Sequence, residues 1–204
     1  MQLVLATNNP DKINEIKYLL GDLPVTILTK HDFLEFPQVE ETGQTLAENA
    51  LIKAKVIAHF CDLPALADDS GLEVDALKGA PGVLSSRYSG LNATYASNCK
   101  KLLKELKTVP KKKRTARFRC VIAIDWNDGT AETTEGVAEG LITDDIKGKQ
   151  GFGYDPVFYY QPKKKRFSEM TTEEKNLVSH RGIALQNMVG LIMKRLNKLN
   201  EKLR

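Results

Sequence analysis

The feature that most constrains the fold is a regular alternation of short apolar runs with longer segments of helical periodicity. An apolar run at 4–6 is followed by residues of helical spacing up to Gly21, and the same order recurs further along the chain. Strands that alternate with helices predict an α/β protein, because each helix can cover one face of a shared sheet.

The strongest strand signal covers 116–126, and 130–142 is predicted to be its partner strand. The intervening Asp128-Gly129 pair is typical of a hairpin turn. A hairpin in an otherwise alternating chain predicts a mixed sheet flanked by helices. Further strands are expected at 25–28 and at 64–67, the latter stopping at Asp68. A Thr45–Glu48 capping box predicts a helix to Cys61, and other helices are expected at 95–107 and 183–203.

Length and composition favour a soluble globular protein. The chain has 204 residues, of which 42% are hydrophobic, so we expect a single domain of two lobes over 1–204. Its apolar stretches are too short to span a membrane, and its first residues lack the pattern of a secretory signal. These features predict a cytoplasmic protein without a membrane partner, and its three cysteines are expected to be reduced.

The formal net charge of +4 fits a small anionic substrate and requires no nucleic acid. Basic residues gather at 110–114 and 163–166, between expected elements. Aromatic residues do not interleave with these runs, as a stacking platform for nucleic acid would need. We therefore expect two solvated loops and no nucleic-acid partner.

The first polar cluster follows the first expected strand and consists of Thr7, Asn8, Asn9, Pro10, Asp11 and Lys12. Small polar residues at a strand-to-helix turn, followed by a lysine, can bind a phosphate group. The alternative is a plain helix cap with a solvated lysine.

The second and third clusters are acidic. Glu40 and Glu41 precede the capped helix, and Asp68 and Asp69 follow the expected strand at 64–67, with Ser70 next to them. Carboxylates are ligands for Mg²⁺, which usually takes only one or two from the protein. The alternative for the aspartates is an acidic surface turn.

The fourth cluster begins in a glycine-rich loop and continues towards the last helix. It comprises Gly151, Phe152, Gly153, Tyr154 and Asp155, followed by Lys175, Ser179, His180 and Arg181. Its aromatic rings could stack on a base, and its cations could donate to a base or a phosphate. A packed aromatic turn and a charged helix end are the alternatives. The chain contains no GxxxxGK[ST] loop and no GxGxxG motif, which disfavours a P-loop or Rossmann enzyme.

Taken in order, these clusters resemble the motifs of the inosine triphosphate pyrophosphatase family over nearly the whole chain. The matching motifs are Thr7-x-Asn9-x-x-Lys12, Glu41-Thr42-Gly43-x-Thr45-x-x-Glu48-Asn49-Ala50-x-x-Lys53, Ala67-Asp68-Asp69-Ser70-Gly71-Leu72, Phe152-Gly153-Tyr154-Asp155-Pro156 and Ser179-His180-Arg181. Gly79-Ala80-Pro81-Gly82 and Ser86-Arg87-Tyr88 also match. One such motif would be weak evidence, whereas the ordered set is specific.

The resemblance implies an elongated fold of two lobes with the substrate in a cleft between them, a homodimer and a Mg²⁺ requirement. It also implies a role for each cluster. Glu41 would bind the metal, with Glu40 beside it as the less favoured choice. Asp69 would be the general base or a second metal ligand, with Asp68 in support. Substrate contacts would come from the turn at 7–12, Lys53, Ser70, the loop at 152–155, Lys175, His180 and Arg181.

The resemblance further implies that His180 and Arg181 lie near position 6 of the purine. Hypoxanthine and xanthine carry an oxygen acceptor there and adenine an amino donor, so an obligate donor such as Arg181 would reject adenine. The competing hypothesis is a non-catalytic nucleotide sensor. The presence of both Glu41 and Asp69 favours the enzyme.

Overall fold

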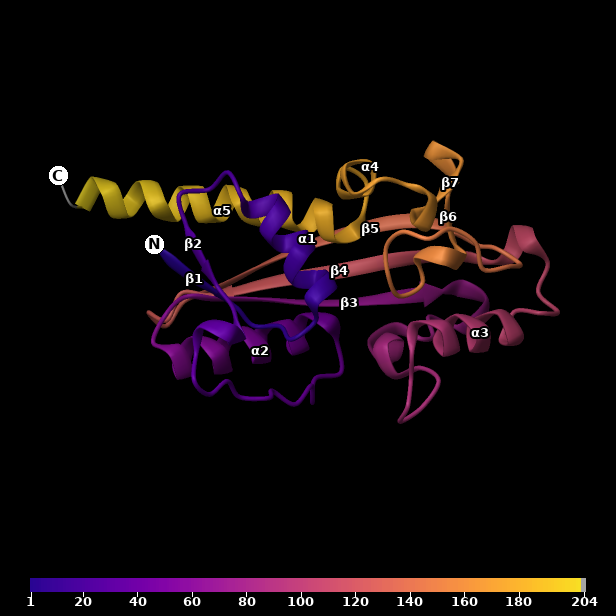
Figure 1. Ribbon diagram of the computed structural model, residues 1–204, viewed down its shortest axis with the longest axis horizontal. Coiled ribbons are helices and arrows are strands. Elements are labelled where there is room, and N and C mark those ends of the chain that lie inside the picture. The colour runs from indigo at the N-terminus through magenta and orange to yellow at the C-terminus, as the bar shows by residue number, and fades with distance from the viewer. Residues whose placement is uncertain (203–204) are drawn as a thin grey trace. The chain divides into compact units, whose positions relative to one another are not determined.

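The computed structural model describes residues 1–202 and forms one seven-stranded sheet flanked by helices (Figure 1). The sheet order is β2-β1-β3-β4-β5-β6-β7. Strand β1 runs parallel to β2 and β3, whereas β6 runs antiparallel to β5 and β7. The predicted mixed α/β sheet is therefore confirmed. The strands are β1 Gln2–Leu5, β2 Thr26–Leu28, β3 Ala65–Val74, β4 Thr115–Asp125, β5 Ala131–Ile142, β6 Phe158–Tyr160 and β7 Lys165–Arg166.

The α-helices begin at side-chain caps that satisfy their first amides. Asn9 caps α1, the Thr45–Glu48 box caps α2 as predicted, and Thr94 caps α3. The helices are α1 Pro10–Leu20, α2 Leu46–Cys61, α3 Tyr95–Glu105, α4 Thr172–Asn176 and α5 His180–Lys202. None of these helices, within residues 1–202, combines the length and apolar character that crossing a membrane needs.

The chain divides into two compact units, and strands β3, β4 and β5 supply residues to both. Unit 1 comprises Met1–Asp69, Cys120–Gly136 and the chain from Arg181 onward. Unit 2 comprises Ser70–Arg119 and Val137–His180.

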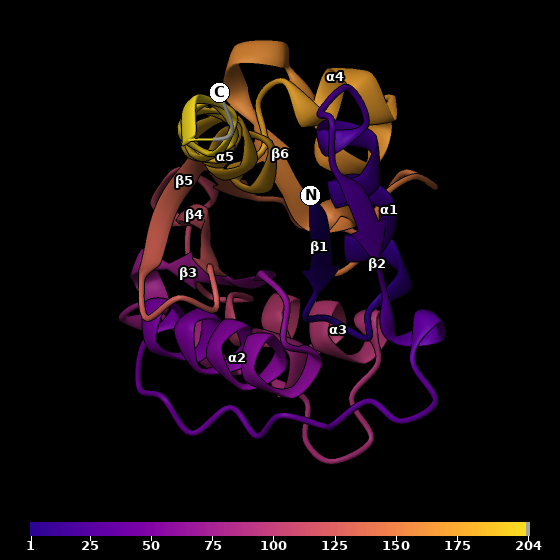
Figure 2. The same ribbon diagram turned by 90° about the vertical axis from the view of Figure 1, so that its left-hand side faces the viewer.

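The core of unit 1 follows from the alternation of side chains along its strands. Leu3 and Leu5 of β1 cluster with Ile16 of α1 and with Leu185 and Met188 of α5. Helix α2 lies on the other side of the sheet, as the end-on view of the helices shows (Figure 2). One face of the unit-1 sheet therefore carries α1 and α5, and the opposite face carries α2.

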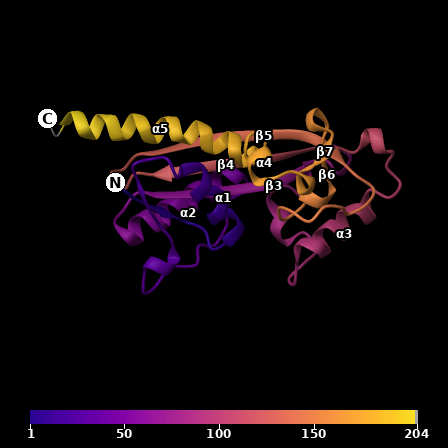
Figure 3. The same ribbon diagram turned by 45° about the horizontal axis from the view of Figure 1, so that its top comes forward.

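Helix α5 runs beside β5 (Figure 3) and is tied to it by side-chain hydrogen bonds. The Thr134 hydroxyl donates to the Ala184 carbonyl over 2.8 Å, and Asn187 Nδ2 donates to the Glu135 carbonyl over 3.3 Å. These contacts fix the first turns of α5, where Arg181 lies.

The core of unit 2 is built on aromatic rings. Phe118 of β4 lies 4.7 Å from Phe158 and 5.8 Å from Phe167, measured between ring centroids. The His180 ring stacks on Phe118 with centroids 4.6 Å apart. His180 thus packs into an apolar core at the start of α5.

Several expected boundaries were wrong. Strand β3 does not stop at Asp68 but continues to Val74, because cations neutralise the carboxylates it carries into the interior. Helix α5 begins three residues earlier than 183, and the predicted position of Leu203 lies outside the described residues. Helix α3 ends at Glu105 rather than 107.

The prediction of two fully solvated basic loops was also wrong in part. Lys111 to Lys113 and Lys163 to Lys164 are exposed, but each run ends in a buried arginine. Arg114 donates to the carbonyls of Val109 and Thr143, and Arg166 donates to Asp145. An arginine side chain has donors enough to bind carbonyls and carboxylates of neighbouring loops at once.

We expect Arg114→Gln to lower the free energy of unfolding by about 1–3 kcal/mol, because backbone carbonyls lose their donors. The exposed neighbour Lys112 is the control, and Lys112→Gln should stay within about 0.5 kcal/mol of the parent protein. Urea denaturation measures both. Equal stability of the two variants would contradict a structural role for Arg114.

Candidate active site

The turn between β1 and α1 is organised by Asn9. Its side-chain oxygen accepts hydrogen bonds from the amides of Asp11 at 2.9 Å and Lys12 at 3.4 Å. The Asn9 amide in turn donates to the Thr7 hydroxyl over 3.3 Å. The amides of Asp11 and Lys12 therefore already donate to the Asn9 cap. Side chains of the turn, Lys12 above all, are the groups through which it can still bind an anion.

Lys12 reaches a carboxylate that is completely buried. Its ammonium lies 3.0 Å from Asp68 Oδ2. The same oxygen accepts Nε and Nη2 of Arg181 at 3.1 and 3.0 Å. Nη1 of Arg181 donates to Glu15 Oε2 over 2.5 Å. Two cations and two carboxylates from α1, β3 and α5 therefore form one ion-pair network inside unit 1.

The network determines the protonation of Asp68. Burial by itself raises the pKa of this carboxyl group, but the charges of Lys12, Arg181 and Lys53 outweigh burial and hold the pKa well below its usual range. Burial likewise lowers the pKa of Arg181, and the charges of Asp68 and Glu15 more than reverse that effect. Both side chains are therefore ionised at neutral pH.

The next residue along β3 faces a different partner. Asp69 Oδ1 lies 3.0 Å from the ammonium of Lys53, and Glu41 Oε1 lies 2.8 Å from the same nitrogen. Neighbouring residues of a strand point to opposite faces, so Asp68 meets α1 and α5 while Asp69 meets Lys53 of α2. One cation thus joins two carboxylates that are far apart in the sequence.

Asp69 and Asp68 are adjacent, yet their pKa values move in opposite directions. Burial raises the pKa of Asp69, Glu41 adds to the rise, and the charges of Lys53 and Lys12 only partly offset it. Burial lowers the pKa of Lys53, but Asp69, Asp68 and Glu41 together raise it. Asp69 is therefore the more basic of the two aspartates, as a proton acceptor must be.

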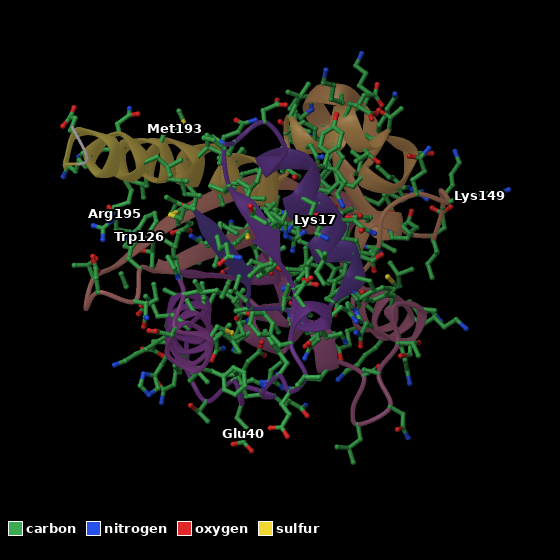
Figure 4. All side chains as sticks on the ribbon, turned by 60° about the vertical axis from the view of Figure 1, so that its left-hand side comes forward. Lys17, Glu40, Trp126, Lys149, Met193 and Arg195 are labelled. Carbon is green, nitrogen blue, oxygen red and sulfur yellow. The ribbon has the colours of Figure 1, made fainter. Side chains whose placement is uncertain are left out.

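Glu41 and Asp69 fit a shared Mg²⁺ ion, because both already bind one cationic group and Mg²⁺ needs only one or two carboxylates. Across residues 1–202 there is no cluster of three or more Asp, Glu, His or Cys arranged to hold a metal. Glu40, the less favoured alternative to Glu41, is exposed, and its labelled side chain points into solvent (Figure 4).

In unit 2, the glycine-rich loop is closed by Asp155. Its Oδ2 accepts the Phe152 amide at 3.0 Å and the Lys175 ammonium at 2.7 Å. Gly151 has a φ of +73°, and a Cβ there would lie 2.1 Å from Asp155 Oδ2, so the loop requires glycine at this position. Asp155 and Lys175 are both buried and form an ion pair, so their charges cancel.

The loop presents Phe152 beside this pair. The Lys175 ammonium lies 4.8 Å from the centre of the Phe152 ring, and the Tyr95 ring lies 5.8 Å from it. Tyr154 is buried and donates through its hydroxyl to the Ser85 carbonyl. Phe152 is half-buried and Tyr95 is exposed, so both rings can contact a ligand, whereas Tyr154 anchors the loop.

The structure thus gathers the sequence-predicted residues into two groups. Unit 1 holds residues 7–12, Glu41, Lys53, Asp68, Asp69 and Arg181, and unit 2 holds Ser70, residues 152–155, Lys175 and His180. The sequence analysis missed Glu15 and Tyr95. Glu15 follows Lys12 by three residues and so shares its side of α1, which was a usable signal. Nothing in the sequence linked Tyr95 to Phe152.

The chain is similar to known proteins over most of its length. The model of the Ham1 family matches residues 3–191. A dITP/XTP pyrophosphatase of Geobacter sulfurreducens is 53% identical over 184 residues, covering 90% of this chain and 92% of its own. One from Bacillus subtilis is 42% identical over 193 residues, covering 94% and 96%. A HAM1 protein structure from Coxiella burnetii superposes with a TM-score of 0.87 at 44% identity, covering 95% and 99%.

The chain belongs to the Ham1 family. The resemblance inferred from the ordered motifs is therefore confirmed, together with the mixed α/β fold.

We expect Arg181→Met to lower the free energy of unfolding at neutral pH by about 3–5 kcal/mol, because Asp68 would stay buried with too little positive charge. The pKa of Asp68 is lowered in the folded protein, so its ion pairs stabilise above the pKa of an unfolded Asp and are lost as the pH falls through the folded value. The difference in the free energy of unfolding between Arg181→Met and the parent protein should therefore become smaller at acidic pH.

Arg195, on the same helix, provides the matched control. It lies over the Trp126 ring at 5.1 Å and pairs with Asp128 at the surface, where Figure 4 labels both Arg195 and Trp126. Arg195→Met should cost no more than about 1 kcal/mol. Urea denaturation at several pH values measures both variants, and a pH-independent deficit for Arg181→Met would argue against the ion-pair explanation.

Proposed function

We propose that this protein hydrolyses non-standard purine nucleoside triphosphates, namely ITP, dITP and XTP, to the monophosphate and pyrophosphate. The observation that carries the proposal is the pairing of Glu41 and Asp69 through Lys53 in the same unit as Lys12. Carboxylates for a metal and lysines for phosphates are the groups that phosphoanhydride cleavage requires. The names of the relatives, dITP/XTP pyrophosphatases, support the same substrates.

In the proposed reaction, water attacks the α-phosphorus and pyrophosphate leaves, without a covalent enzyme intermediate. Glu41 and Asp69 would hold Mg²⁺, which when bound neutralises phosphate oxygens and the leaving group. Asp69, which shares Lys53 with Glu41, would orient the water and accept its proton. Lys12 and Lys53 bind the triphosphate and stabilise the charge that moves to pyrophosphate. Asp68 keeps Lys12 in place.

Selectivity is assigned to unit 2. Phe152 would stack on the purine, and Lys175, held by Asp155, would donate to it. The role of Arg181 as a reader of position 6 stays a prediction. Its guanidinium donates to Asp68 and Glu15, which favours a role in holding the phosphate-binding network. His180 packs on Phe118 in the core of unit 2.

The proposal includes a homodimer that acts in the cytoplasm on a free nucleotide, with neither nucleic acid nor membrane as partner. The homodimer rests on the family resemblance, and light scattering on the purified protein tests it. The cytoplasmic location and the absence of a nucleic-acid or membrane partner rest on the proposed substrate, which is a small, free anion.

We expect the purified protein with Mg²⁺ to convert ITP into IMP and pyrophosphate, and to act poorly on ATP. Ion-exchange chromatography of the products decides the site of attack, because IDP and orthophosphate would mean attack at the γ-phosphorus. Tight binding of ITP without any product would instead support the nucleotide sensor.

We expect Asp69→Asn to remain folded and to lose about 10²–10⁴-fold in turnover, because the amide cannot accept the proton of water. Asp75, an exposed carboxylate just after β3, is the control, and Asp75→Asn should retain turnover. Steady-state kinetics at saturating Mg²⁺ compares the two. Full turnover by folded Asp69→Asn would exclude Asp69 from the chemistry.

A further inference from the structure

Asn49 of α2 is buried and holds the backbone of the segment that carries Glu41. Its side-chain oxygen accepts the amide of Gly43 at 2.8 Å, and the residue is 1% exposed. Its neighbour Glu48 accepts the amides of Gln44 at 2.6 Å and Thr45 at 3.2 Å. Three successive amides before α2 are therefore held by two side chains of the helix itself.

The segment lies so close to the helix that only glycine fits at its centre. A Cβ at Gly43 would lie 2.6 Å from the Cβ of Glu48 and 2.7 Å from the Oδ1 of Asn49. These separations are far below van der Waals contact. The hydrogen bond from Gly43 to Asn49 depends on that close approach.

Asn49 and Lys53 are four residues apart on α2 and so lie on the same side of the helix. Lys53 binds the Glu41 carboxylate, and Asn49 binds the backbone two residues further on. Glu41 is therefore held at both ends, through its side chain by Lys53 and through its main chain by Asn49. A loop carboxylate without the second contact would have many positions to sample.

An amide and a carboxylate at position 49 would differ in their hydrogen bonds and in their charge. Its Nδ2 is buried and has no hydrogen-bond partner within the described part of the chain, which costs stability. An aspartate would accept the same Gly43 amide more strongly and leave no donor unpaired. It would also add a negative charge beside Glu41 and Asp69 and compete with them for Lys53. The neutral side chain avoids that competition.

We propose that Asn49 is a positioning residue that fixes the Glu41 segment through the Gly43 amide and so keeps the Glu41 carboxylate opposite Asp69. The proposal deepens the proposed function, on which it rests for the role of Glu41 as a metal ligand. The placement of the segment itself is independent of that role. The two can therefore be tested separately.

The first measurement is hydrogen exchange of the full-length protein without nucleotide, followed at the Gly43 amide. Asn49→Ala should speed exchange at Gly43 by about 2- to 10-fold, the effect of one lost hydrogen bond. Asn49→Asp should keep the amide protected, because a carboxylate oxygen still accepts it.

Asn98 of α3 offers a matched control in unit 2. It is 2% exposed, and its Oδ1 accepts the Ser89 amide at 2.8 Å, the same contact that Asn49 makes with Gly43. Its Nδ2 donates to the carbonyls of Ser85 and Ser86. Asn98→Ala should therefore lower thermal stability at least as much as Asn49→Ala, without faster exchange at Gly43.

The second measurement is the Mg²⁺ concentration that gives half-maximal hydrolysis of ITP. Asn49→Ala should raise it by about 10–100-fold, the usual effect of removing a group that orients a ligand. Asn98→Ala should leave it unchanged. Asn49→Asp should instead raise KM for ITP, because its charge repels the triphosphate and competes for Lys53.

Unchanged exchange at Gly43 in Asn49→Ala would overturn the proposal. So would an unchanged Mg²⁺ requirement in this variant when Glu41→Gln raises that requirement. If Glu41→Gln leaves the Mg²⁺ requirement unchanged, the metal role of Glu41 in the proposed function fails. The positioning of the segment by Asn49 is then decided by the exchange measurement alone.

Discussion

The carboxylate of Asp68 is completely buried in β3, and the polar arrangement of unit 1 follows from the need to neutralise it. An isolated carboxylate in that position would be costly, and burial alone raises its pKa. Lys12 from α1 and Arg181 from α5 supply the opposite charge, and Glu15 balances the second of these cations. The network thereby ties α1 and α5 to β3 and holds the Lys12 side chain beside Asp68.

The alternation of side chains along β3 gives two adjacent aspartates different chemistry. Asp68 lies among cations that keep it ionised, and it acts as a structural anion. Asp69 points to the other face, where it shares Lys53 with Glu41 and where burial raises its pKa. The contrast makes Asp68 a structural anchor, whereas Asp69 lies beside Glu41 with only one lysine between them. Because the two side chains are chemically identical, the difference in their pKa values comes from their surroundings.

In unit 2 a buried aspartate is likewise neutralised by a cation, through one ion pair instead of a network. Asp155 and Lys175 form a buried pair that closes the loop around Gly151, and the pair holds the Phe152 ring beside the lysine. An aromatic face next to a fixed donor suits a purine, whereas the cations and carboxylates of unit 1 suit phosphates and a metal. Each unit thus has its own set of buried charges, a network in unit 1 and a single ion pair in unit 2.

The sequence by itself determined the class of fold, most strands and helices, the caps of α2 and the family, because these depend on local periodicity and on ordered motifs. It also identified Lys12, Lys53, Glu41 and Asp69 as candidates. Only the tertiary structure decided that β3 continues through Asp68, that Arg114 and Arg166 are buried, and that Arg181 binds Asp68 and Glu15. The physical reason is that a charged residue can enter the interior only with a partner, and these partners come from distant parts of the chain. Asp68 and Arg181 are separated by 113 residues, and no local pattern records their contact.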